Sequence, residues 1–221
     1  MNPILTPLFL SLRVAGFATL LSIALGVPAA AALARKTHFF ANILDAAANL
    51  PLVLPPTVLG YYLLVAFGNR SPLGSALASI GIRLTFTWYG AVIAAALVAL
   101  PLVVQSTRAA LEVVDPDLED VARTLGRTNL SVFMTISLPL AWRGVLAGGM
   151  LAFSRALGEF GATLLVAGNI PGSTQTLPIA IYDAVQSGDQ NLANGMALIL
   201  TITALILLML IRRLSQGDRH P

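Results

Sequence analysis

The sequence predicts an all-α integral membrane protein with five transmembrane helices. Of its 221 residues, 57% are hydrophobic and only 10% are charged, whereas a soluble domain carries roughly 25% charged residues. The apolar residues form five runs, each near the roughly 20 residues that a helix needs to cross a bilayer. We expect one transmembrane domain over residues 7–212. Its spans are expected at about 8–34, 46–68, 85–107, 140–166 and 191–211.

The first span begins near Pro7 and contains no charge after Arg13. The N-terminus lacks the basic segment and the small-residue cleavage site of a signal peptide, so we expect this run to remain as a spanning helix.

The second span contains three prolines, Pro51, Pro55 and Pro56. Proline removes a backbone donor and kinks or breaks a helix. One interpretation is an ordinary proline-kinked helix, and the other is a broken helix beside a polar pathway, where irregular backbone is tolerated in a membrane. The residues that would line or gate such a pathway are Pro55, Pro56, Thr57, Tyr61 and Tyr62.

The third and fifth spans are uncharged, whereas the fourth contains Arg155 and Glu159 well inside its apolar run. Residues four apart share one face of a helix and can pair. Ionisable groups inside a membrane usually mark a functional site, so Arg155 and Glu159 are candidates for a pathway or gate. The alternative is a neutralised pair that fixes helix packing. Between the last two spans, residues 177–186 are expected to form a short surface helix.

Lysine and arginine gather in the regions that must share one side of the membrane, and this side is predicted to be cytoplasmic. The N-terminus is therefore expected outside, and the tail, residues 213–221, in the cytoplasm. The small net charge of +3 indicates orientation rather than binding to nucleic acid. The cations are Arg35 and Lys36 after the first span, Arg108, Arg123, Arg127 and Arg143 between the third and fourth, and Arg212, Arg213 and Arg219 at the end.

The hydrophilic segment between the third and fourth spans is predicted to fold as two short helices. Asp115 can cap the first, and proline at 116 suits its first turn. Gly126 can end this helix in a left-handed conformation. Asn129 or Ser131 can cap the second, and Pro139 then opens the fourth span.

No catalytic or cofactor-binding motif is present. The only lysine, Lys36, does not lie in a phosphate-binding loop, and the metalloprotease and serine-hydrolase motifs are missing. Cysteine is absent, and His38 and His220 cannot build a metal site. We therefore expect no enzyme activity, metal or bound cofactor. A stand-alone secondary anion carrier or channel, a scaffold, or a subunit driven by another protein remain.

The hydrophilic segment resembles the cytoplasmic signature of the permease subunits of bacterial ABC importers: Glu-Ala-Ala, three residues, Gly, nine residues, Ile, one residue, Leu-Pro. The spacing matches throughout, with Asp-Val-Ala in place of Glu-Ala-Ala and a glutamate one residue earlier. The resemblance implies that residues 115–138 are coupling helices that dock on an ATPase, and leaves open which acid makes the contact. The implied coupling residues are Glu119, Asp120, Ala122, Gly126, Ile136, Leu138 and Pro139.

The second span and the FSRALGEFGATLLVAGNIPG stretch of the fourth resemble permeases for tetrahedral oxyanions, most closely for molybdate, with sulfate and tungstate next. The resemblance implies a homodimer in the inner membrane of a bacterial cell. It also implies two cytoplasmic ATPase subunits, which use ATP and Mg²⁺, and an extracytoplasmic molybdate-type binding protein. In such an importer, ATP binding brings the coupling helices together and opens the spans outward, and hydrolysis resets them.

Overall fold

The computed structural model describes residues 2–34 and 39–216, and every element in these ranges is helical. This confirms the all-α fold class. Within these described ranges, four helices are long and apolar enough to cross a membrane, and a bent pair of helices adds a fifth crossing if it is counted as one span. The predicted orientation and the predicted lack of a metal site depend in part on residues that lie outside the described ranges. These residues are Arg35, Lys36, His38, Arg219 and His220.

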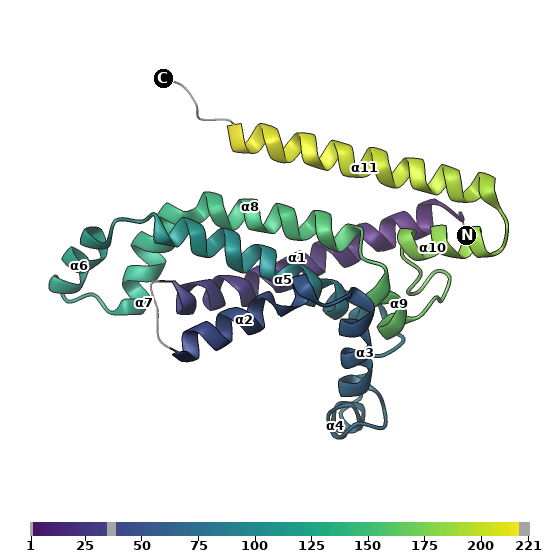
Figure 1. Cartoon of the computed structure of the whole chain (residues 1–221), viewed down its shortest axis with the longest axis horizontal. Helices are drawn as coiled ribbons and strands as arrows, with labels where there is room; N and C mark the ends of the chain where they lie inside the picture. Colours follow the sequence, from purple (N-terminus) through teal and green to yellow (C-terminus); the bar gives the residue numbers. More distant parts are fainter. Residues whose placement is uncertain (1, 35–38, 217–221) are drawn as a thin grey trace.

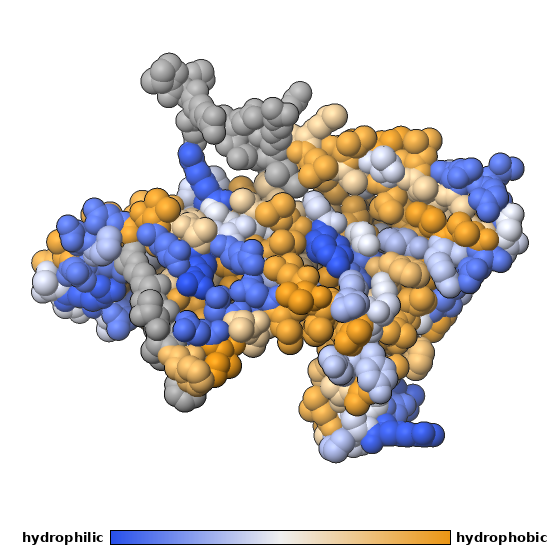
Figure 2. Space-filling view, viewed as in Figure 1, coloured by the Kyte–Doolittle hydropathy of each residue, from blue (hydrophilic) through white to orange (hydrophobic). Residues whose placement is uncertain are grey.

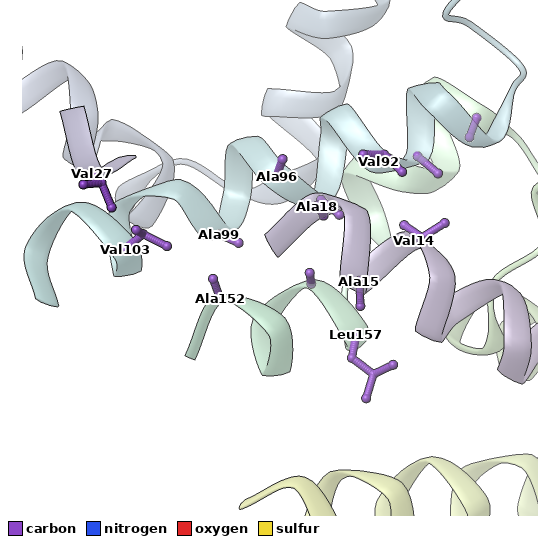
Figure 3. Close-up of a cluster of buried hydrophobic side chains, with 14 residues drawn as sticks. Val14, Ala15, Ala18, Val27, Val92, Ala96, Ala99, Val103, Ala152 and Leu157 are labelled. Atoms are coloured by element: carbon purple, nitrogen blue, oxygen red, sulfur yellow. The ribbon is translucent and has the colours of Figure 1, made fainter. Parts of the chain in front are cut away.

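The centre of the molecule is a bundle of α1 (Leu5–Leu33), α5 (Trp88–Glu112) and α8 (Leu138–Leu157). The side chains at their contacts are mostly small. Ala18, Ala99 and Ala152 are fully buried, one from each helix, and Figure 3 shows them between the three ribbons. Small residues let helices approach closely, and this packing takes the place of the hydrophobic effect inside a bilayer.

The second predicted span, 46–68, is not one helix. It is divided into α2 (Phe39–Val53) and α3 (Pro56–Phe67), which meet at an angle of 114°. Pro55 precedes α3 and Pro56 occupies its first turn, where a missing N–H costs nothing. The two consecutive prolines therefore end one helix and start another, which favours the broken-helix interpretation over the kinked one.

The fourth predicted span, 140–166, is also wrong as a continuous helix. The helix α8 ends at Leu157, and a short helix, α9 (Gly161–Ala167), follows in a new direction. Glycine at 158 and 161 weakens the helix at this point. The helix α9 packs against α3, so the break in the fourth span lies beside the break in the second.

The remaining helices lie at the ends and edge of the bundle. A helix that the sequence did not predict, α4 (Pro72–Ser79), follows α3. The predicted surface helix 177–186 forms as α10 (Leu177–Gln186). The last helix, α11 (Gln190–Gln216), is longer than predicted and packs on α10 near its start, and Leu200 and Leu207 pack against the central bundle. It runs along the outside of the bundle beside α8 (Figure 1).

Hydrophilic side chains gather at the two ends of the long axis, and the region between them carries both apolar and hydrophilic patches on this face (Figure 2). The start of α1 and α10 lie at one end, and the segment between α5 and α8 lies at the other, toward which α11 also runs (Figure 1). The start of α1 and the end of α11 lie at opposite ends, which agrees with an odd number of spans. Which end faces the cytoplasm stays a prediction.

Replacing Gly60 by leucine is expected to separate α3 from α9. A Cβ at Gly60 would lie 2.7 Å from the Cα of Ala162, and such overpacking against backbone costs about 1–3 kcal/mol or more. We expect the melting temperature in detergent to fall by roughly 5–10 °C. The control is Gly16→Leu, because a Cβ at Gly16 meets nothing within 4 Å. Equal melting temperatures for the two variants would contradict this packing.

Candidate functional site

The first part of the segment 115–138 folds as its local sequence predicts. The helix α6 (Pro116–Thr124) begins after Asp115, whose carboxylate accepts a hydrogen bond from the N–H of Asp117 at 3.0 Å. It ends at Gly126, which has φ +84°. The N–H of Arg127 then reaches back to the carbonyl of Ala122 at 3.1 Å, so the last turn is closed in the manner of a glycine C-cap.

The second part differs from the prediction. The residue that caps α7 (Asn129–Val132) is Thr128, whose hydroxyl accepts from the N–H of Ser131, and not Asn129 or Ser131. The helix continues through a π-helical turn, η1 (Phe133–Ser137), directly into α8. Pro139 therefore lies within one long helix rather than at its start. The wider turn immediately before Pro139 accommodates its missing N–H.

Glu119 ties α6 to this long helix. Its side chain is 12% exposed. One carboxylate oxygen accepts from the hydroxyl of Ser137 at 2.8 Å, and the other from Arg123 at 3.0 Å. Asp120 also pairs with Arg123 but is 68% exposed, and hydrogen bonds to Asp120 and then Glu119 raise the pKa of Arg123 above its ordinary value. Of the two candidate acids, Glu119 is mostly buried and holds α6 against the long helix, whereas Asp120 is exposed at the surface.

The other implied coupling residues also divide into buried and exposed ones. Ala122 is buried and Leu138 packs on the central bundle, whereas Ile136 is half-buried, and Gly126 and Pro139 are exposed. Large apolar side chains surround them on the surface. An exposed apolar patch of this kind, mixed with charges, is typical of a protein-binding surface. We call this set the apolar tip: Leu118, Val121, Leu125, Leu130 and Met134, each 49–79% exposed.

Arg155 and Glu159 form an ion pair at the break in the fourth span. The guanidinium Nη1 lies 2.7 Å from Oε2 of Glu159, and the two side chains are 35% and 2% exposed. Glu159 lies beyond the end of α8, so the expectation that they share a helix face is wrong, although they pair. The other oxygen, Oε1, accepts from the N–H of Ala162 at 2.9 Å. One buried carboxylate thus joins the end of α8 to the start of α9.

The structure brings most of the other pathway candidates to the same place. The methyl of Thr57 lies 2.9 Å, and the ring of Pro56 3.6 Å, from where a Cβ of Gly161 would be. Pro55 stands at the head of α3. Tyr61 is 57% exposed. Their role in a pathway remains a prediction.

A group of polar residues between α2 and α5 was not predicted from the sequence. Arg108 donates to Asp45 at 2.8 Å and to Glu112 at 2.8 Å, and the amide of Gln105 donates to Asn49 at 2.7 Å. We call these five residues the α2–α5 polar cluster. Their spacing held a signal, because positions 45 and 49, and positions 105, 108 and 112, each fall on one face of a helix.

Comparisons with known proteins agree on one family. Residues 22–216 match the model described as "Binding-protein-dependent transport system inner membrane component". The chain is 45% identical to the molybdenum transport system permease protein ModB of Escherichia coli (strain K12), covering 96% of this chain and 93% of that protein. It is also 45% identical to ModB of Haemophilus influenzae, covering 94% and 91% of the two chains.

Solved structures share the fold at low sequence identity. The inward-facing MetNI methionine ABC transporter aligns with a TM-score of 0.75 and 15% identity, over 98% of this chain and 96% of that chain. A bacterial ABC transporter for import of the acidic polysaccharide alginate aligns with a TM-score of 0.77 and 13% identity, over 100% and 81%.

Proposed function

The chain belongs to the family of binding-protein-dependent transport system inner membrane components, and on that premise we propose that it is the permease subunit of an ABC importer for molybdate. The assignment of molybdate as the substrate rests on the 45% identity of this chain, over more than nine-tenths of its length, to proteins named as molybdenum transport permeases. The location follows from the family, because its members are inner-membrane components.

The segment 115–138 is proposed to couple ATP hydrolysis to transport. It presents the apolar tip on the surface, and its internal contact between Glu119 and Ser137 holds α6 rigidly on the long helix that becomes α8. A displacement of α6 by a partner is therefore passed to a membrane-spanning helix. The proposed partner is a cytoplasmic ABC ATPase dimer, which binds ATP and Mg²⁺, whereas this chain binds no cofactor.

Serine in place of Leu125 and Val121 is expected to weaken binding of the ATPase. Both side chains are more than half exposed, so their loss removes contact area without opening a cavity. Truncating such anchors costs roughly 2 kcal/mol, or more than tenfold in affinity. The measurement is recovery of the ATPase with affinity-purified permease. Ile80→Ser, equally exposed but on the turn after α4, is the control and should retain full recovery.

A homodimer is the proposed assembly in the membrane. An apolar groove of about 600 Å³ lies along α1 and α8, lined by Ile23, Leu138, Trp142, Leu146 and Phe153 among others. The second half of α11 exposes a further apolar face. Both surfaces need cover from lipid or from a second permease. An extracytoplasmic molybdate-type binding protein is proposed to deliver the anion at the opposite end from the apolar tip.

The anion is proposed to pass where the second and fourth spans are broken. Irregular backbone at membrane depth is tolerated where it lines a cavity or is buried in protein. Arg155 remains partly exposed beside this point and supplies the positive charge that a dianion needs on its way. Glu159 holds Arg155 in position, and Pro55, Pro56, Thr57 and Tyr61 line or gate the path.

Reconstitution tests the function. The permease is placed in liposomes with its ATPase inside and its binding protein outside, and uptake of labelled molybdate is measured with and without ATP. We expect uptake that requires ATP and the binding protein, and that is competed by tungstate more than by sulfate. Uptake by the permease alone under an ion gradient would instead support a stand-alone carrier, and binding of partners without transport would support a scaffold.

A further inference from the structure

The α2–α5 polar cluster joins α2 to α5 by hydrogen bonds between their side chains. Of the apolar residues of α2, Ala48 packs beside a buried cluster that includes Leu111 of α5, and Pro51 is buried. Five larger apolar side chains of α2 are exposed instead. Because the buried apolar residues are small, the hydrogen bonds of the polar cluster help to fix the position of α2 on α5. The exposed side chains are Ile43, Leu44, Leu50, Leu52 and Val53, each 47–81% exposed.

The cluster also lies between the proposed coupling segment, residues 115–138, and the break between α2 and α3. Glu112 is the last residue of α5, and Asp115, the cap of α6, follows three residues later. The linker is held in place, since Val114 is only 6% exposed. In the other direction, α2 leads directly to the break before Pro56 and to α3. The space-filling view shows hydrophilic side chains over the region of α2 and α5 (Figure 2).

The charges of the cluster argue against a site for the transported anion. Asp45 and Glu112 contribute two carboxylates, and Arg108 contributes one guanidinium that already bonds both. The local charge is therefore negative, and a like-charged oxyanion is repelled. The arrangement instead fits a role in connecting α2 to α5 mechanically.

We propose that Asp45 and Arg108 are positioning residues that transmit movement of the segment 115–138 through the end of α5 to α2, and so to the broken span. The proposal rests on the proposed function. Movement of α6 carries Arg108 with it, and the ion pair to Asp45 carries α2. Without the pair, ATP hydrolysis continues and α2 no longer follows, so transport becomes uncoupled from hydrolysis.

The first test measures molybdate uptake and ATP hydrolysis in the same proteoliposomes. Asp45→Asn keeps the side-chain size and Arg108→Gln shortens the side chain, and both remove the ion pair. Each is expected to lower the uptake per ATP hydrolysed by about five- to tenfold, from the strength of charge-assisted hydrogen bonds at partly exposed sites. ATPase binding should be unchanged. Because the two residues act as one pair, the double variant should be no worse than either single variant.

The matched control is Arg83→Gln, which removes an exposed arginine distant in sequence from the cluster. It should leave the ratio of uptake to hydrolysis at the wild-type value. The proposal is overturned if Asp45→Asn and Arg108→Gln keep that ratio, or if their losses simply add in the double variant.

A second test follows the motion directly. The chain has no cysteine, so Ile43→Cys and Val113→Cys, both at exposed positions, can carry two spin labels. In the ATPase complex, the distance between the labels should stay in one narrow distribution with and without a non-hydrolysable ATP analogue, and Asp45→Asn should broaden it. An unchanged distribution in Asp45→Asn would overturn the link. A wild-type complex that imports no molybdate would overturn the proposed substrate alone, since the label distances still test the link.

Discussion

Replacing Glu159 by alanine is expected to cause the largest loss of stability and transport of any single change considered. The buried carboxylate pairs with Arg155 and accepts from the N–H of Ala162. Its removal leaves a guanidinium in an apolar span without its partner and α9 without its N-terminal acceptor. Removing one partner of a buried pair costs about 3–5 kcal/mol, with the lower value expected here because Arg155 is 35% exposed.

The measurements are the melting temperature in detergent and ATP-dependent molybdate uptake. Glu159→Gln keeps an oxygen for Ala162 and loses the charge, so it should fall between wild type and Glu159→Ala. Asp189→Ala is the matched control, since the carboxylate of Asp189 accepts a capping hydrogen bond from the N–H of Leu192 at 3.0 Å on an exposed surface, and its loss costs about 1 kcal/mol. A stability of Glu159→Ala equal to that of Asp189→Ala would refute the structural role of the carboxylate.

Arg155→Gln separates the pathway role from the packing role. Glu159 keeps its hydrogen bond to Ala162 in this variant, but its carboxylate, 2% exposed, loses the cation beside it, so a loss of stability is expected here too. Uptake is therefore compared per amount of folded permease, and if Arg155 serves the anion, it should fall further than in Glu159→Gln at equal stability. Wild-type uptake by a stably folded Arg155→Gln permease would remove Arg155 from the proposed pathway.

Replacing Glu119 by alanine is expected to uncouple the ATPase from the membrane helices. The carboxylate holds α6 on the long helix through Ser137 in a buried hydrogen bond of 2.8 Å. A hydrogen bond to a charged group contributes about 1.5–3 kcal/mol, so its loss lowers the equilibrium constant for docking of α6 by roughly tenfold or more. Molybdate uptake should fall in step with the docked fraction, by up to the same factor. Hydrogen exchange in residues 116–124 should rise in parallel.

Ser137→Ala and Asp120→Ala complete this test. Ser137→Ala removes the other partner of the same bond and should show the same increase in exchange. Asp120 is 68% exposed and bonds only Arg123, so Asp120→Ala should leave exchange in α6 unchanged and affect ATPase binding alone. Slow exchange in Glu119→Ala would show that the apolar contacts of α6 are sufficient to dock it.

Local signals in the sequence predicted a large part of the fold. The apolar runs predicted the positions of the long apolar helices α1, α5 and α11, and the surface helix α10 was predicted with its correct limits. Asp115 as a cap and Gly126 as a helix end were also correct. Each of these features depends on residues within one or two turns of one another. The cap of α7 was mistaken because three neighbouring residues, Thr128, Asn129 and Ser131, all have side chains that can cap.

The sequence by itself therefore determined the all-α membrane fold, the family signature in residues 115–139 and the main sites to examine. Only the tertiary structure decided that the second and fourth spans are broken and meet each other, that Glu119 is internal while Asp120 is exposed, and that Arg108 reaches Asp45. The physical reason is that a buried polar group must find a hydrogen-bond partner. That partner is supplied by chain 18 residues away for Glu119 and 63 residues away for Asp45, beyond the reach of any helical periodicity.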